Sequence, residues 1–89
     1  MLIINPISGT GSKKGVEEMT CRLMADCGHE VDVRYTGARG DATRLASEAV
    51  RRGYYGVLAC GGDGTVNETA RALCDTSTAL GILPAGSGN

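Results

Sequence analysis

Short apolar runs alternate along the chain with longer stretches in which apolar residues recur every three or four positions. The short runs predict strands over residues 2–5, 31–35, 57–60 and 79–83. The longer stretches predict helices over residues 13–27, 41–52 and 65–74. Gly28 and Gly53 follow the first two of these helices and are expected to end them.

The spacing of the apolar residues predicts which face of each helix packs on the sheet. On the first helix, that face is expected to consist of Val16, Met19, Leu23 and Cys27. Asp41 is the predicted N-cap of the second helix, whose polar positions at Arg44, Glu48 and Arg51 are expected to face water. The apolar stripe of this second helix consists of Ala42, Leu45, Ala46, Ala49 and Val50.

Elements in the order βαβαβαβ predict an α/β fold. We expect a three-layer sandwich with a parallel, Rossmann-like sheet and helices on both of its faces. The run over residues 57–60 is apolar throughout and is bounded by glycines, which is typical of a central strand buried on both faces. With 89 residues the chain has room for one core, so residues 1–89 are expected to form a single domain.

The candidate chemistry lies directly after that central strand, in Gly61-Gly62-Asp63-Gly64-Thr65. Glycines permit positive φ angles and close approach of the backbone, so successive N–H groups can point at one phosphate. Thr65 and Glu68 have the spacing of a capping box, which predicts a helix N-terminus beside the same anion. A carboxylate at Asp63 would repel phosphate unless a cation lies between them, which indicates Mg²⁺-nucleotide chemistry. The alternative is a tight strand-to-helix turn with Asp63 in solvent.

Other polar and glycine-rich clusters follow the remaining predicted strands. Asn5-Pro6-Ile7-Ser8-Gly9 follows the first, Thr36-Gly37 the second and Pro84-Ala85-Gly86-Ser87-Gly88-Asn89 the last. Parallel strands end at one edge of a sheet, and ligands of such sheets bind beyond that edge. We therefore expect the four clusters to converge on one site.

These motifs together give the chain a family resemblance. An opening Asn-Pro-x-Ser-Gly, a central Gly-Gly-Asp-Gly-Thr-x-x-Glu and a later Pro-x-Gly-Ser-Gly-Asn resemble the diacylglycerol kinase catalytic domain family, which includes bacterial lipid kinases and sphingosine kinases. The resemblance covers nearly the whole chain. It implies that residues 1–89 are the N-terminal, nucleotide-binding domain of a two-domain lipid kinase, whose β-rich second domain completes the lipid site and is absent from this sequence.

The resemblance also implies roles for individual residues. Asp63 is the expected catalytic residue and would act on Mg²⁺ indirectly, through the nucleotide, or in a proton relay. Glu68 is explained equally well by the capping box and by direct ligand contact. The expected ATP-binding residues are Asn5, Pro6, Ser8, Gly9, Thr36, Gly61, Gly62, Gly64, Thr65, Asn67, Glu68, Gly86 and Ser87.

Composition and charge narrow the range of partners. The net charge is −1 and the basic residues are interspersed with acids, so nucleic acid is not an expected partner. The four cysteines form no C-x-x-C pair and are expected to be reduced core residues. The N-terminus lacks the pattern of a signal peptide, which predicts a cytoplasmic protein. Two further partners are compatible with the sequence. One is a membrane surface, contacted peripherally, and the other is a second copy of the chain, paired through an unpaired sheet edge.

The function expected from sequence is therefore ATP-dependent phosphorylation of a hydroxyl of diacylglycerol or a related lipid, with ATP and Mg²⁺ as cofactors. One alternative is an NAD kinase-like enzyme, which shares Gly-Gly-Asp-Gly-Thr but not the Asn5-Pro6 motif. Another is a nucleotide-binding module that is not catalytic in isolation.

Overall fold

The predicted strands and helices are all present in the structure, a computed structural model that describes residues 1–7 and 13–83. In chain order they are β1 (Leu2–Ile4), α1 (Lys14–Asp26), β2 (Val33–Tyr35), α2 (Asp41–Arg51), β3 (Gly56–Cys60), α3 (Asp63–Leu73) and β4 (Ala79–Leu83). The prediction for β4 agrees at both ends, whereas α3 begins two residues earlier than predicted.

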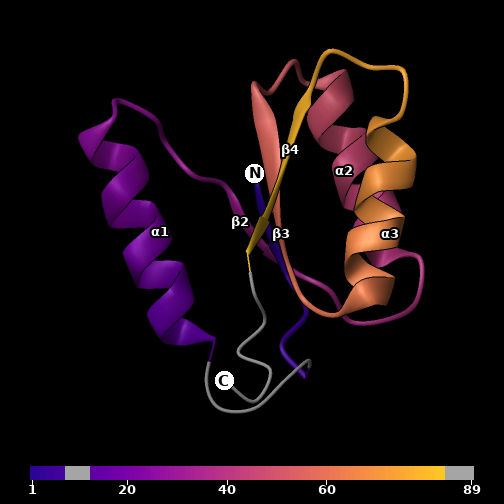
Figure 1. Cartoon of the computed structure of the whole chain (residues 1–89), viewed down its shortest axis with the longest axis horizontal. Helices are drawn as coiled ribbons and strands as arrows, with labels where there is room; N and C mark the ends of the chain where they lie inside the picture. Colours follow the sequence, from indigo (N-terminus) through magenta and orange to yellow (C-terminus); the bar gives the residue numbers. More distant parts are fainter. Residues whose placement is uncertain (8–12, 84–89) are drawn as a thin grey trace.

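The four strands form one parallel sheet in the order β2-β1-β3-β4. Leu2 of β1 lies opposite Val33 on one side and Leu58 on the other, so β1 is an inner strand although it comes first in the chain. Helix α1 covers one face, and α2 and α3 lie side by side on the other (Figure 1). This arrangement confirms the α/β prediction, with β3 inside the sheet and β2 at its edge.

The better-packed half of the core lies between the sheet and helices α2 and α3. Ile3 and Val57 of the sheet contact the predicted stripe of α2, of which Ala46 and Ala49 are fully buried. The alanines have no atoms beyond Cβ, so α2 can lie close to the strands. Val50 is only partly buried but packs on the same cluster. The predicted apolar face of α2 is therefore confirmed.

The predicted face of α1 is correct for Val16, which packs against the sheet, and wrong for the other three residues. Met19 and Leu23 are 61% and 54% exposed, and Cys27 is also exposed. Thr20, one turn after Val16, is buried although the apolar spacing did not include it. The hydroxyl of Tyr35 in β2 donates a hydrogen bond to Glu17, and this polar contact holds that side of α1 toward the sheet. Apolar spacing alone gives no information about such a contact.

Glycines rather than polar side chains shape two helix boundaries. Gly40, with φ of 92°, is the N-cap of α2, so the prediction that Asp41 occupies this position is wrong. Asp41 is the first helical residue, and its carboxylate accepts hydrogen bonds from the N–H groups of Gly37 and Ala38. Gly53, with φ of 73°, follows the end of α2 as predicted.

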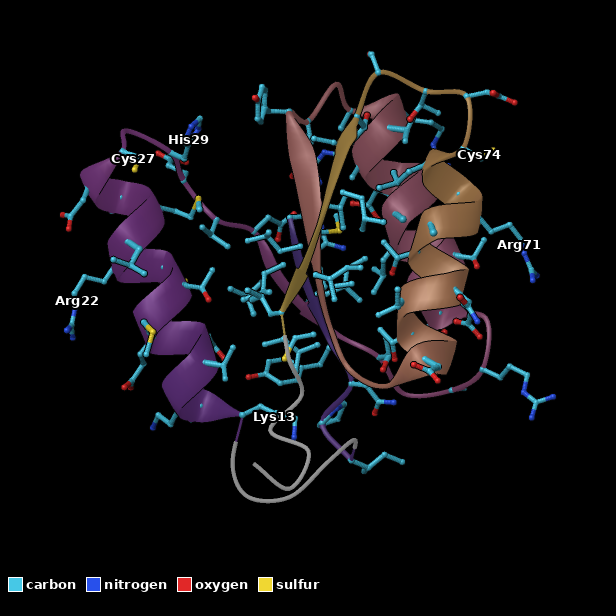
Figure 2. All side chains as sticks on the ribbon, in the orientation of Figure 1. Lys13, Arg22, Cys27, His29, Arg71 and Cys74 are labelled. Atoms are coloured by element: carbon cyan, nitrogen blue, oxygen red, sulfur yellow. The ribbon has the colours of Figure 1, made fainter. Side chains whose placement is uncertain are left out.

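All four cysteines are free thiols, but only Cys60 is a core residue. Burial raises the pKa of the Cys60 thiol, while the nearby charge of Lys13 acts in the opposite direction. Cys27 and Cys74 are exposed at the ends of α1 and α3 (Figure 2), so the expectation of a core position is wrong for both. Each is the C-cap residue of its helix, at the point where the chain leaves the helix.

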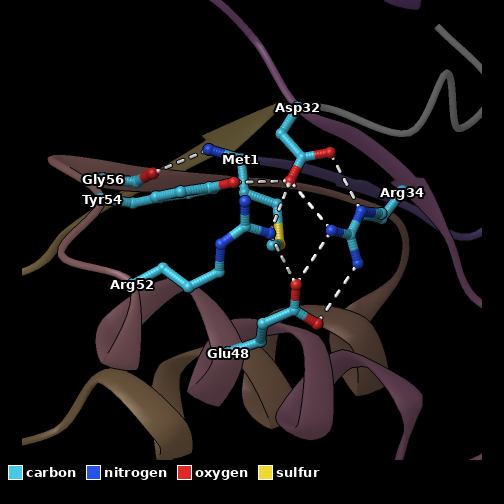
Figure 3. A network of polar contacts seen from close by, with 7 residues as sticks. All are labelled: Met1, Asp32, Arg34, Glu48, Arg52, Tyr54 and Gly56. Atoms are coloured by element: carbon cyan, nitrogen blue, oxygen red, sulfur yellow. Dashed lines mark hydrogen bonds and ion pairs between the residues drawn. The ribbon is translucent and has the colours of Figure 1, made fainter.

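A polar network joins β2, α2 and the segment before β3 near the amino ends of the strands (Figure 3). Arg34 is at its centre and donates to both Asp32 and Glu48. Its Nε lies 2.9 Å from Oδ1 of Asp32, and its Nη2 lies 2.9 Å from Oε2 of Glu48. Tyr54 donates to Asp32 at 2.8 Å, and Arg52 pairs with Glu48 at 2.9 Å. Glu48 is therefore partly buried in a network, and the expectation that it faces water is wrong.

Because of this network, we expect the folded state to lose stability at acidic pH. Burial raises the pKa of Asp32, but hydrogen bonds from Arg34 and Tyr54 outweigh it, so the pKa is lowered overall. Hydrogen bonds from Arg34 and Arg52 lower the pKa of Glu48 as well. Since the folded state binds these protons more weakly, the network's stabilisation is present above the unfolded pKa values of about 3.9 and 4.3, and it is lost as the pH falls through the lower folded values.

Denaturant unfolding of the wild type and of Arg34→Met at pH 7 and pH 3 measures this effect. We expect the variant to be less stable at pH 7, and the difference to shrink at pH 3, where the carboxylates of the wild type become protonated. Arg22→Met, at an exposed position on α1 (Figure 2), is the matched control and should differ little from the wild type at either pH. A difference for Arg34→Met that is equal at the two pH values would contradict the prediction.

Candidate functional site

Three of the four predicted loops meet at the carboxyl ends of the strands. The N–H of Asn5, after β1, donates to the carbonyl of Cys60 at the end of β3, at 2.9 Å. The N–H of Thr36, after β2, donates to the carbonyl of Ile4 at 2.8 Å. Asn5, Thr36 and the loop that begins at Gly61 are thus next to one another along one edge of the sheet, as the sequence predicted.

This edge contains the point where the order of the strands reverses. The chain passes from β1 to β2 on one side and then crosses back over β1 to form β3 on its other side. Helices α1 and α3, which follow β1 and β3 in the chain, lie on opposite faces of the sheet (Figure 1). In open α/β sheets, a ligand-binding crevice forms at such a point.

Helix α3 begins at this edge, directly after β3. It starts at Asp63, with Gly62 as its N-cap, and only Gly61 and Gly62 separate it from β3. Glycine has no side chain with which to cap the helix, and the first N–H groups of a helix have no partners inside it. The predicted capping box is wrong, because Thr65 and Glu68 lie within the helix and not at its start. Backbone N–H groups and the helix dipole at this N-terminus favour an anion.

Gly61 is required here by close packing and not by a left-handed backbone. The positive-φ glycines among the described residues are Gly28, Gly40 and Gly53, none of which is in this loop. A Cβ placed on Gly61 would lie 2.7 Å from Cβ of Thr65 and 3.1 Å from Cβ of Asn5. The absence of a side chain at Gly61 therefore allows β1, β3 and α3 to approach one another at the site.

The remaining predicted residues differ in their exposure to solvent. Gly62, Asp63, Gly64 and Asn67 are exposed, as is Pro6 in the turn after β1. Thr65 is only 7% exposed, and its hydroxyl faces the main chain of Gly61. Four other predicted residues lie outside the described part of the chain; they are Ser8, Gly9, Gly86 and Ser87.

Some polar groups at this edge already have partners within the protein. The side-chain oxygen of Asn5 accepts the N–H of Ile7 at 3.1 Å, which closes the turn that contains Pro6. In the loop after β2, hydrogen bonds from the N–H of Gly37 and Ala38 lower the pKa of Asp41 and keep its carboxylate ionised. Hydrogen bonds from within the protein thus fix this loop.

Glu68 has a partner that sequence reasoning missed. Its carboxylate accepts the N–H of Gly40 at 3.0 Å, and its carbonyl accepts the hydroxyl of Thr43 at 2.9 Å. Glu68 therefore joins α3 to the loop at the start of α2. The two partners are 28 and 25 positions away in the sequence, so no local motif could have indicated them.

A cleft at the other end of the sheet does not suit phosphate. A cleft of about 680 Å³ lies beside the amino ends of β3 and β4, near the end of α1. It is lined mainly by apolar residues such as Met24, Val31 and Leu80, together with the acids Glu30 and Asp32, which would repel an anion. We therefore place the candidate site at the opposite edge, where the helix N-terminus and the glycine loop lie.

The described residues were also inspected for metal ligands and for membrane-spanning helices. Within residues 1–7 and 13–83, no three His, Cys, Asp or Glu side chains are grouped closely enough to hold a metal ion. None of the helices in these ranges combines the length and apolar character needed to cross a bilayer. At the candidate site, Asp63 is an exposed carboxylate in the first turn of α3.

Comparison with known proteins identifies relatives of this chain. Residues 1–89 match the diacylglycerol kinase catalytic domain. A probable lipid kinase, YegS-like, from Cronobacter sakazakii is 40% identical over 87 residues, which cover 93% of this chain and 29% of that protein. A protein of the same name from Klebsiella pneumoniae is 41% identical over 91 aligned positions, covering all of this chain and 30% of that protein.

A solved structure gives the same result. The crystal structure of a diacylglycerol kinase from Bacillus anthracis superposes with a TM-score of 0.75 and 27% identity, covering 99% of this chain and 30% of that one. The chain thus spans about 30% of the length of the relatives it matches. Matching sequence, architecture and motif order over residues 1–89 show that the chain belongs to the diacylglycerol kinase catalytic domain family.

Proposed function

We propose that the chain binds the phosphates of Mg²⁺-ATP at the N-terminus of α3, as the nucleotide-binding part of a lipid kinase. The observation that carries the proposal is the exposed N-terminus of α3, which has a glycine N-cap and lies where the strand order reverses. Membership of the diacylglycerol kinase family supports a nucleotide as the phosphoryl donor.

Helices α2 and α3 lie side by side on one face of the sheet, so their N-termini can be compared as anion sites. Both have a glycine N-cap at the same edge of the sheet. At α2, the N–H groups of Gly37 and Ala38 are bound by Asp41, and that of Gly40 is bound by Glu68. These carboxylates occupy the place an anion would take, so α3 is the better candidate for phosphate.

Asp63 is proposed to act on the Mg²⁺ that accompanies the nucleotide. Its exposed position in the first turn of α3 puts a negative charge beside the proposed phosphate site. A divalent cation between the two would remove the repulsion and neutralise charge that develops during transfer. In that transfer, the oxygen of the acceptor hydroxyl bonds to the γ-phosphorus and the bond to the β–γ bridging oxygen breaks. ADP leaves with that oxygen, and the hydroxyl proton passes to solvent.

The acceptor is proposed to be diacylglycerol or a related lipid. The proposal is supported by the names of the relatives, which are lipid kinases and diacylglycerol kinases. A lipid substrate further suggests a cytoplasmic protein that contacts the membrane surface. Strand β4 is a candidate surface for a homodimer, because Leu80 and Ile82 are 38% and 58% exposed and the strand carries no charged residue to discourage pairing.

Isothermal titration of the 89-residue chain with ATP in Mg²⁺ tests the nucleotide proposal. We expect saturable binding that weakens about tenfold, or ~1.4 kcal/mol, in Asp63→Asn, because the neutral amide cannot hold the cation. Omission of Mg²⁺ should weaken binding to the wild type more than to the variant. Titration with NAD measures the affinity for the substrate of the alternative, NAD kinase-like function.

The matched control is Asp75→Asn, which makes the same change just beyond the other end of α3. Asp75 has φ of 61°, a conformation that asparagine also tolerates, so the fold should be unaffected. ATP affinity in this control should equal that of the wild type. Equal losses in both variants, or tighter binding of NAD than of ATP, would argue against the proposed function.

A further inference from the structure

Glu68 connects the two sides of the candidate site. It lies in the second turn of α3, the helix whose N-terminus is the proposed phosphate site. Its side chain reaches the N–H of Gly40, at the start of α2, over 3.0 Å. The hydroxyl of Thr43, one turn further along α2, donates to the main chain of the same glutamate at 2.9 Å. One residue thus accepts two hydrogen bonds from the neighbouring helix and its entry loop.

The loop that Glu68 holds is the segment between β2 and α2, residues 36–40. At its first residue, Thr36 is bonded to the end of β1 through its N–H. At its last residue, Gly40 has φ of 92°, a left-handed conformation in which other residues are strained. Asp41 ties the middle of the loop to α2 through Gly37 and Ala38. The bond from Gly40 to Glu68 is the contact that relates this loop to α3.

The geometry of this bond separates two roles for the glutamate. A carboxylate that binds a cation directly needs its negative charge. A carboxylate that accepts a backbone N–H needs only an oxygen at the same place, which glutamine also provides. Since Glu68 is half-buried and its Oε2 is directed at Gly40, the observed contact is of the second kind.

We propose that Glu68 is a positioning residue that fixes the loop of residues 36–40 relative to the N-terminus of α3. The bond holds Thr36 and the glycine loop at one spacing across the crevice, so that both can contact the same nucleotide. The consequence for affinity rests on the proposed function, whereas the position of the loop does not. Loss of the bond leaves the loop attached to α2 but removes its direct hydrogen bond to α3.

Two variants of Glu68 and two measurements test the proposal on the 89-residue chain. In ¹H–¹⁵N spectra without nucleotide, Glu68→Ala should shift the amide resonance of Gly40 and speed its hydrogen exchange about fivefold, because one hydrogen bond is lost. Its affinity for Mg²⁺-ATP should fall by a similar factor. Glu68→Gln should keep both properties within about twofold of the wild type, since the amide oxygen accepts the same N–H.

Glu18→Ala, an exposed glutamate on α1, is the matched control and should change neither measurement. If Glu68→Gln loses as much affinity as Glu68→Ala while the Gly40 resonance stays in place, Glu68 acts on the ligand and the positioning role is overturned. An unchanged Gly40 resonance in Glu68→Ala would also overturn it. If the wild type fails to bind ATP, the proposed function fails, and the Gly40 measurement still decides whether Glu68 holds the loop.

Discussion

Replacing Ile3 with alanine is expected to destabilise the fold by about 2–5 kcal/mol, the usual effect of truncating a fully buried isoleucine. Ile3 is 0% exposed in the middle of β1 and packs with Ala46, Ala49 and Val57. The loss of three methyl or methylene groups leaves a cavity that these neighbours cannot fill. The free energy of unfolding of a domain is only about 5–15 kcal/mol, so this variant should be close to the limit of folding.

Ile7→Ala is the matched control, since it removes the same atoms from a side chain that is 88% exposed. We expect a change within about 0.5 kcal/mol for this surface position. Denaturant unfolding followed by circular dichroism compares the two variants with the wild type. Equal stability of Ile3→Ala and Ile7→Ala would contradict the assignment of β1 to the interior.

Gly61→Ala is expected to destabilise the protein by about 1–3 kcal/mol, as is common for overpacking. The new methyl group would lie 2.6 Å from Oγ1 and 2.7 Å from Cβ of Thr65. Rotation of the threonine side chain could move Oγ1 but not Cβ, so the backbone of β3 or α3 must shift. Because that shift would move the N-terminus of α3, the proposed phosphate site, the affinity for Mg²⁺-ATP should fall by about tenfold or more.

Gly64→Ala, in the first turn of α3, separates packing from ligand contact. A Cβ at Gly64 meets no atom within 4 Å, and alanine in a helix is favoured over glycine by about 0.5–1 kcal/mol. Gly64→Ala should therefore be at least as stable as the wild type, and a loss of ATP affinity in this variant would mean that the ligand approaches the backbone there. Unfolding measurements and titrations on both variants give the comparison. Wild-type stability of Gly61→Ala would contradict the close packing described above.

The fold could be predicted from sequence because its signals are local. The stripe of Ala42, Leu45, Ala46 and Ala49 repeats with the period of a helix, and the apolar run before Gly61 fits an inner strand. The face of α1 could not be predicted, because Met19 and Leu23 form an apolar stripe that the described structure leaves exposed. Its orientation depends on Tyr35 and Glu17, which come from different elements.

The position of the site could also be predicted, since parallel strands bring the loops after Asn5, Thr36 and Gly61 to one edge. Its internal contacts could not. The spacing of Thr65 and Glu68 suggested a local cap, but α3 begins before both, so their side chains meet Gly61 and Gly40 instead. The nucleotide contacts of the site residues stay predictions.

The inner place of β1 has a consequence for the order in which the chain folds. Both neighbours of β1 are distant in sequence, because Leu2 pairs with Val33 and with Leu58. Of the four strands, the wholly apolar β1 is synthesised first. Some 30 further residues must be made before one of its partner strands exists, and nearly 60 before the other does. Contacts this far apart in the sequence slow folding and leave apolar segments open to aggregation in the meantime. Of the strands of this sheet, β1 is thus the one that stays unpaired for the longest stretch of synthesis and the one that a chaperone would most need to cover.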